Sequence, residues 1–116
     1  MTEVREYRTR DGRRPLSEWI AALRDRSARS RVLARIDRLS IGLRGDWKPV
    51  GQGVFELRVA CGPGYRIYCG AHRNELVILL CGGDKRKQAH DIETAHAYWQ
   101  DFKERSDFAE RSVQRR

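Results

Sequence analysis

The sequence predicts an α+β fold, in which a twisted antiparallel sheet carries an N-terminal helical hairpin on one face and a C-terminal helix elsewhere. Two observations predict this fold. Apolar residues recur at helical spacing between positions 15 and 43 and again between positions 88 and 105. Between these regions, three alternating or wholly apolar segments are separated by turn sequences. The expected element order is therefore β-α-α-β-β-β-α.

The N-terminal part of the chain is expected to form an edge strand and two helices. Residues 3–8 alternate imperfectly among charges, which suits a short edge strand. Pro15 fits the first turn of a helix, and an apolar stripe follows at Leu16, Trp19, Ile20 and Leu23. A second helix is expected to start near Ser27, with a stripe formed by Leu33, Ile36, Leu39 and Leu43. The short connection predicts an antiparallel helical hairpin.

The C-terminal part is expected to supply the remaining strands and the last helix. Residues 53–62 and 62–70 alternate, whereas the run 75–81 is apolar throughout, which indicates a central strand covered on both faces. "CGPG" and "AHRN" mark two hairpin turns, and "GDWKPVG" is a break with room for a short strand. Residues 88–105 are expected to close a single domain, 1–105, which a polar tail, 106–116, follows.

The composition favours a polyanionic partner. The chain has 24 Lys and Arg residues against 16 Asp and Glu residues, a net charge of +8, which attracts nucleic acid first. An arginine-rich composition bias is the alternative explanation. No apolar run is long enough to cross a bilayer, and the charged N-terminus "MTEVREYRTR" has no signal-peptide core. A cytoplasmic protein without membrane contact is therefore expected.

The cysteines indicate neither a metal site nor a disulfide framework. Cys61, Cys69 and Cys81 are odd in number, no C-x-x-C pair occurs, and the three histidines share no ligand-type spacing with them. Free thiols, packed as small hydrophobic groups in a reducing compartment, are expected. We expect no metal and no cofactor.

Strand alternation places two arginines on one surface of the predicted sheet. If the alternating apolar residues face the core, then Arg58, Arg66 and Tyr68 must face the other way, on adjacent strands. Two cations so placed repel each other unless an anion lies between them. Glu56 can fill that role, and so can a bound ligand.

A basic turn follows the apolar run 75–81. Asp84, Lys85, Arg86 and Lys87 come after two glycines, which we expect to let the backbone turn sharply and approach a ligand closely. The three cations would then form the lip of an anion-binding concavity whose floor carries the two strand arginines. The alternative is a solvated turn whose charges protect a strand end against aggregation.

The segments "FELR", "GPGYRIY" and "LLCGGDKRKQ…DI..A..YW" resemble, in this order and spacing, the RelE/ParE superfamily of toxin–antitoxin toxins. The resemblance covers residues 3–105 and is greatest to the HigB-type branch of phage-derived or addiction-module killer proteins. It implies a RelE-like fold, an antitoxin partner and, in many members, cleavage of mRNA in the ribosomal A site. It also matches Arg58 to a phosphate-contacting arginine, Arg66 to the arginine of "GYRIY", and residues 84–87 to the basic turn. The chain departs from several nuclease members in lacking a clear His or Tyr match just after that turn, where Gln88 and Ala89 precede His90.

The reaction expected on this basis is metal-independent cleavage of RNA through its own 2′-hydroxyl group. Such cleavage needs a base, an acid, and cations for the charge that builds on the phosphoryl oxygens. Guanidinium binds two oxygens at once, so arginine suits the phosphoryl contact. The residues expected to be catalytic are Arg58, Arg66, Lys85 and Lys87. One of the lysines would be the base if neighbouring cations favour its neutral form, with Asp84, Tyr68 and His90 as alternatives.

RNA binding is expected from residues around this site and from the second predicted helix. The expected contacts are Tyr68, Asp84, Arg86, Arg31, Arg35 and Arg38. The three helix arginines would grip ribosomal RNA. The expected partners are thus a cognate antitoxin, mRNA and the ribosome. Two alternatives remain: a non-nuclease inhibitor that binds DNA gyrase, as ParE-like members do, and a plain nucleic-acid-binding module.

Overall fold

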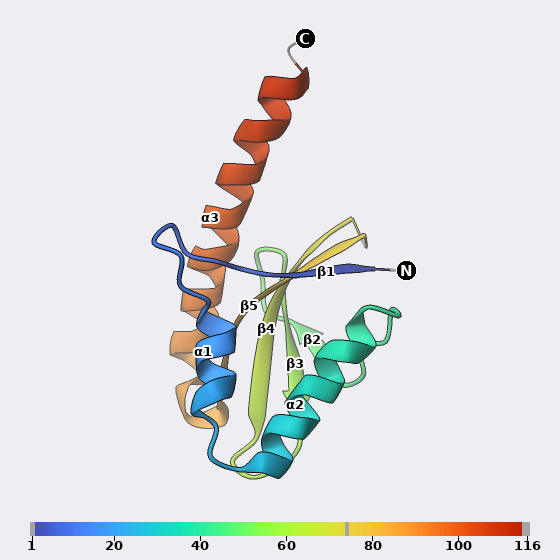
Figure 1. Ribbon diagram of the computed structural model, residues 1–116, viewed down its shortest axis with the longest axis vertical. Helices are drawn as coiled ribbons and strands as arrows, with labels where there is room; N and C mark the ends of the chain where they lie inside the picture. The colour runs from blue at the N-terminus through green and yellow to red at the C-terminus, as the bar shows by residue number, and fades with distance from the viewer. Residues whose placement is uncertain (1, 74, 115–116) are drawn as a thin grey trace.

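The computed structural model describes residues 2–73 and 75–114, with side chains described as far as residue 106. It has five strands and three α-helices in this part of the chain (Figure 1). The elements, in chain order, are β1 (Glu3–Glu6), α1 (Pro15–Ala22), α2 (Arg26–Leu39), β2 (Trp47–Pro49), β3 (Val54–Val59), β4 (Tyr65–His72), β5 (Leu76–Asp84), the 3₁₀ turn η1 (Lys85–Lys87) and α3 (Gln88–Gln114). The predicted α+β class is confirmed, with one further short strand, β2, in the break.

The five strands form a single sheet in the order β1-β5-β4-β3-β2. Strands β2 to β5 pair antiparallel, as predicted, but β1 pairs parallel to β5, with Glu3 opposite Leu76. The sheet is therefore mixed, and the prediction of an antiparallel sheet was wrong for β1. Alternation predicts which face a side chain occupies, but it carries no information about strand direction.

Each face of the sheet has its own apolar core. Phe55, Leu57 and Ile67 pack with α1 and α2 residues such as Leu16 and the partly buried Trp19. On the other face, Tyr68, Leu80 and Trp99 pack together, with Ile92 and Phe102 of α3 against them. Helices α1 and α2 cover one face, as predicted, and α3 covers the other, a position that the sequence did not specify (Figure 1). The two N-terminal helices diverge from their short connection and barely contact each other, so the prediction of an antiparallel helical hairpin was wrong. β5 is an interior strand, and helices contact it from both faces, as the missing alternation predicted.

The second helix buries part of the predicted stripe. Leu39 is buried and Ile36 packs against the same core, as predicted. Leu33 and Leu43 are 45% and 54% exposed, and the buried positions are completed by Ala28 and Val32. The helix ends at Leu39, because Gly42 takes a positive φ of 83° and reverses the chain, so Leu43 lies outside the helix.

The last helix is longer than predicted. Its backbone continues past position 105 to Gln114, so the backbone of the predicted polar tail is helical as far as it is described. Residues 115 and 116 of that tail lie outside the described residues.

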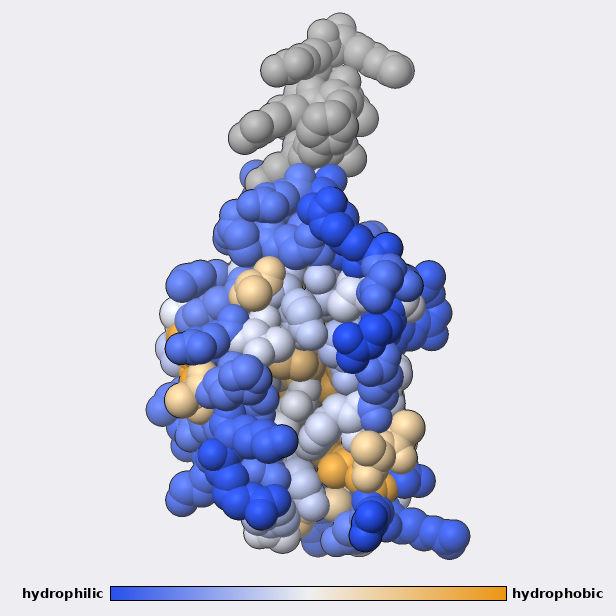
Figure 2. Space-filling model, turned by 90° about the vertical axis from the view of Figure 1, so that its left-hand side faces the viewer, coloured by the Kyte–Doolittle hydropathy of each residue, from blue (hydrophilic) through white to orange (hydrophobic). Residues whose placement is uncertain are grey.

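The surface is dominated by charged residues. Figure 2 shows the side of the molecule along which α1 and α3 both run. This side is mostly hydrophilic, with small apolar spots and a band of intermediate hydropathy between charged flanks. Within the described part of the chain, none of the helices combines the length and apolar character that a bilayer crossing requires.

Two tryptophans lie flat on glycines of the sheet, one on each face. A Cβ atom at Gly70 would lie 2.2 Å from Trp99 Cε3, and one at Gly82 would lie 2.3 Å from Trp19 Cε3. Gly83 leaves room for Asp91 in the same way. Gly82 and Gly83 are therefore positions of helix packing within β5, and the prediction that they turn the chain or approach a ligand was wrong.

We predict that Gly70→Ala lowers the free energy of unfolding by about 1–3 kcal/mol, because the added methyl overlaps the Trp99 ring. Chemical denaturation measures this change. The same substitution in a Trp99→Leu background, where the ring is absent, should cost less. Equal costs in the two backgrounds would show that the indole ring does not set the requirement for glycine.

Candidate functional site

The two predicted arginines lie side by side on the face that α3 covers. Arg58 of β3 and Arg66 of β4 are directly opposite each other in the antiparallel register. Their neighbours along the strands, Leu57 and Ile67, are buried in the core on the opposite face. Strand alternation therefore predicted the orientation of both guanidinium groups correctly.

The carboxylate of Glu56 lies between these two arginines and is fully buried. Its Oε2 accepts a hydrogen bond from Arg58 Nε at 3.2 Å, and its Oε1 accepts one from Gln88 Nε2 at 2.7 Å. Arg66 Nε lies 3.3 Å from Oε1 as an ion pair, without the alignment of a hydrogen bond. Glu56 thus supplies the anion that the sequence requires between the two cations.

The two arginines differ in how far they reach solvent. The side chain of Arg66 is 13% exposed, and its Nη1 donates to the carbonyl oxygen of Gly64 at 3.1 Å. The side chain of Arg58 is 37% exposed, with its Nε engaged by Glu56. Arg66 is therefore mainly tied to its own hairpin turn, and Arg58 is the one placed to meet a ligand.

The predicted basic turn is η1, and all three of its cations are exposed. The backbone N–H of Lys85 donates to the Gly64 carbonyl oxygen at 3.0 Å, which fastens η1 to the turn beside Arg66. Asp84 caps η1 by accepting from the Arg86 N–H at 2.9 Å, and its carboxylate pairs with the Arg86 guanidinium. The Arg86 hydrogen bond is the main reason that the pKa of Asp84 is lowered.

This end of the sheet carries an excess of positive charge. Five cations, Arg58, Arg66, Lys85, Arg86 and Lys87, stand against the carboxylates of Glu56 and Asp84. Asp91 of α3 adds a third carboxyl group nearby, so the cations are still in excess. We call the five cations with Glu56 and Asp84 the basic edge. Glu56 offsets one of the two strand arginines, not both, so the site still favours an anion.

Tyr68 is a correction to the predicted RNA contacts. Its side chain is fully buried among residues packed under α3, and its hydroxyl has no hydrogen-bond partner in the described part of the chain. Burial raises the pKa of Tyr68 far above its usual value, so its neutral form is favoured. The alternation correctly placed it on the α3 face, but that face is covered there, so Tyr68 is a core residue.

Two residues of α3 near this site were missed from the sequence. Gln88 orients Glu56, and Asp91 lies over Gly83 with a buried Oδ2 that has no hydrogen-bond partner among the described residues. Burial raises the pKa of Asp91. The sequence signal for Asp91 is Gly83 in β5, which leaves space for the Asp91 side chain rather than for a ligand.

The histidines and cysteines lie away from any cluster of ligands. His96 Nε2 is 2.9 Å from the Val50 carbonyl oxygen, while His72 and His90 are exposed. The three cysteines are free, as predicted. The described side chains contain no group of three or more His, Cys, Asp or Glu residues that could hold a metal ion.

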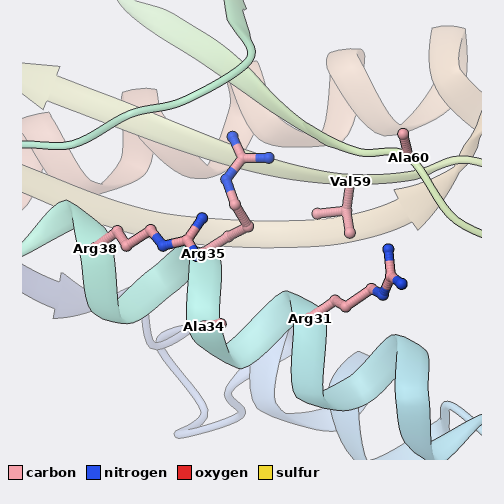
Figure 3. A pocket seen from close by; sticks show the side chains of 6 residues that line it. All are labelled: Arg31, Ala34, Arg35, Arg38, Val59 and Ala60. Atoms are coloured by element: carbon pink, nitrogen blue, oxygen red, sulfur yellow. The ribbon is translucent and has the colours of Figure 1, made fainter.

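The arginines of α2 line a pocket of about 290 Å³ against the end of β3. Arg35 reaches from the helix toward the strand, and Arg31 reaches toward the strand end (Figure 3). The lining residues are Arg31, Ala34, Arg35, Arg38, Val59 and Ala60. Arg31 and Arg38 are exposed, as a nucleic-acid contact requires, whereas Arg35 is half-buried.

Arg35 ties the α2 helix to the strand that carries Arg58. Its guanidinium donates to the carbonyl oxygens of Arg44 at 2.6 Å, Asp46 at 3.0 Å, and Arg58. The N–H of Arg58 in turn donates to the Asp46 carbonyl oxygen at 2.9 Å. Burial lowers the pKa of Arg35. Its hydrogen bonds to the protein backbone indicate that Arg35 positions Arg58.

We predict that Arg35→Ala lowers the free energy of unfolding by about 1–3 kcal/mol, because three hydrogen bonds from its guanidinium to backbone carbonyl oxygens are lost. Arg31→Ala and Arg38→Ala, at exposed positions of the same helix, should stay within about 0.5 kcal/mol of the wild type. Urea denaturation followed by circular dichroism compares the three variants. An equal effect of all three would contradict a structural role for Arg35.

We predict that Glu56→Gln lowers the free energy of unfolding by about 1–3 kcal/mol, since two neighbouring arginines lose their shared counter-charge. Glu3→Gln is the matched control, because Glu3 pairs with Arg5 on the exposed surface. Thermal and denaturant unfolding measure both variants. Unchanged stability of Glu56→Gln would mean that the arginines do not depend on this carboxylate.

Comparison with known proteins gives a family for the chain. Residues 18–100, which include Arg58, Arg66 and the basic turn, match the family model described as phage derived protein Gp49-like (DUF891). The chain is also similar to a protein of Haemophilus influenzae (strain Rd) described as uncharacterized, with 48% identity over 77 residues that cover 66% of this chain and 78% of the relative. The Gp49-like family is a RelE/HigB-type family of toxin–antitoxin toxins, so membership implies an antitoxin partner. Because the family model matches most of its length, the chain belongs to the Gp49-like family of phage-derived toxins.

Proposed function

We propose that this chain is a HigB-like toxin that cleaves mRNA on the ribosome, in the cytoplasm and without a metal ion, and thereby arrests translation and growth. The observation that carries the proposal is the position of Arg58. Its guanidinium is partly exposed, held by Glu56 through Nε, and lies beside Arg66 at the basic edge.

The phosphoryl contact is assigned to Arg58. Glu56 engages its Nε, so the terminal nitrogens of the guanidinium remain available for two phosphoryl oxygens. A guanidinium held in place before the substrate arrives needs little reorganisation as charge builds on those oxygens. Arg66 supports this contact from the side by keeping Glu56 and the Gly64 turn in place.

The proton transfers are assigned to the exposed turn η1. The base toward the 2′-hydroxyl is assigned to Lys85 or Lys87, because both side chains lie beside the strand arginines where a bound RNA strand can reach them. The group that takes the proton is the neutral amine of that lysine. Burial removes Tyr68 from the alternatives. Asp84 is engaged with Arg86, whereas His90 is exposed near the start of α3 and remains the alternative to the two lysines as the base.

Ribosome binding is assigned to Arg31 and Arg38. They are exposed, and the pocket that they line lies at the same strand end as Arg58. Contacts from arginine to phosphate supply affinity without sequence preference, which suits a surface that holds ribosomal RNA.

The test adds the purified chain to a cell-free translation reaction and maps the ends of the mRNA by primer extension. We predict cuts within translated codons, and a loss of about 10²–10³-fold in cleavage for Arg58→Ala, the range seen when one preorganised donor is removed. The same variant should no longer inhibit growth when expressed without a partner. Arg13→Ala, which breaks an exposed ion pair with Glu18, is the matched control and should retain activity.

The other outcomes identify the alternatives. Intact mRNA together with blocked supercoiling in a gyrase assay supports the gyrase inhibitor. RNA binding without growth arrest supports a plain binding module. Full toxicity of a folded Arg58→Ala variant would remove Arg58 from the mechanism.

A further inference from the structure

Three apolar side chains project from the chain between α2 and β3. Ile41 is 64% exposed, Leu43 is 54% exposed and Trp47 is 43% exposed. We call these three residues the α2–β2 ridge. Apolar side chains that are exposed together on a surface mark an interaction site more often than single ones do. Arg44, which follows Leu43, places its guanidinium on the Trp47 ring and so links the two ends of the ridge.

The ridge is held in place by the protein. The N–H groups of Ile41 and Leu43 donate to the carbonyl oxygen of Arg38 at 3.2 Å and 2.9 Å. The Arg44 guanidinium lies 4.7 Å from the centre of the Trp47 ring, in a cation–π contact. A surface ordered before its partner arrives loses less entropy on binding.

Two hollows adjoin the ridge. One is the arginine-lined pocket of α2, and Arg35 in its wall binds the carbonyl oxygens of Arg44 and Asp46, which precede Trp47. The other, of about 220 Å³, is lined by Thr2, Leu39, Gly42, Arg44 and Val77. Gly42 lies between two ridge residues in the chain. The ridge thus offers a partner apolar anchors with a cationic hollow beside them.

We propose that the α2–β2 ridge docks a segment of the cognate antitoxin that presents apolar side chains next to carboxylates. Aliphatic Ile41 and Leu43 neither stack on bases nor bind phosphates, so they favour a protein partner over RNA. The exposed guanidinium groups of Arg31 and Arg38 complement carboxylates. Membership of a toxin–antitoxin family implies a partner of this kind.

This docking mode explains neutralisation and, in that respect, rests on the proposed function. An antitoxin segment on the ridge would cover the arginines that are assigned to ribosomal RNA. It would leave the side chain of Arg58 uncovered, because that side chain lies on the α3 face and α2 packs on the other face. Neutralisation would then act by blocking ribosome binding rather than by filling the basic edge.

The probe for the test is the protein encoded by the reading frame adjacent to the gene of this chain. Its affinity for the full chain is measured by isothermal titration calorimetry, with the fold of each variant checked by circular dichroism. The double variant Ile41→Asp/Leu43→Asp should bind about 100-fold more weakly, since it loses two apolar anchors and adds like charge. Leu33→Asp is the matched control, because Leu33 is 45% exposed on α2 but lines neither hollow, and it should bind as the wild type does.

Growth assays separate this inference from the proposed function. Expressed alone, the double variant should inhibit growth as the wild type does, and co-expression of the probe should no longer relieve the inhibition. Unchanged affinity of the double variant, equal loss in Leu33→Asp, or failure of the wild-type chain to bind the probe would overturn the inference. So would a double variant that keeps its affinity but loses mRNA cleavage, because the ridge would then serve the ribosome. If the wild-type chain cuts no mRNA but the double variant binds the probe more weakly, the proposed function is refuted and the docking site is supported.

Discussion

The carboxylate of Glu56 is fully buried, and a charge in such a position is tolerated only when it is paired and hydrogen-bonded. Its partners are Arg58, Arg66 and Gln88. They come from β3, β4 and α3, so this one carboxylate joins two neighbouring inner strands to the last helix. The same requirement orients Arg58, because the partner that satisfies Glu56 is also the group that meets a phosphate in the proposed reaction.

The end of β3 links two surfaces that lie on opposite faces of the sheet. The side chain of Arg58 belongs to the α3 face, while its carbonyl oxygen is bound by Arg35 from α2. The arginine-lined pocket and the basic edge therefore share one rigid strand end. A protein of this size can in this way place the proposed phosphate contact and the proposed ribosome-binding arginines close together without a second domain.

Strand alternation predicted from the sequence which face each side chain of β3 and β4 occupies, and with it the pairing of Arg58 with Arg66. The alternation is a local property with period two, so a single strand carries enough information for it. The sequence did not predict the parallel pairing of β1, the exposure of Leu33 on α2 or the burial of Tyr68. These features depend on which element covers which face, and the sequence pattern of one element does not encode its neighbour. The role of Gly82 and Gly83 in β5 was wrongly predicted for the same reason. The side chains that occupy the space above them, Trp19 and Asp91, lie elsewhere in the chain.

The parallel pairing of β1 with β5 has a consequence for synthesis. Residue 3 pairs with residue 76, and Gln88 and Trp99 of α3 pack against the sheet. These contacts join residues that are far apart in the sequence, so they form late in folding. In a nascent chain from which α3 has not yet emerged, Glu56 lacks its hydrogen bond from Gln88, and the α3 face of the sheet is exposed to solvent. The complete fold can therefore form only after the residues of α3 have left the ribosome.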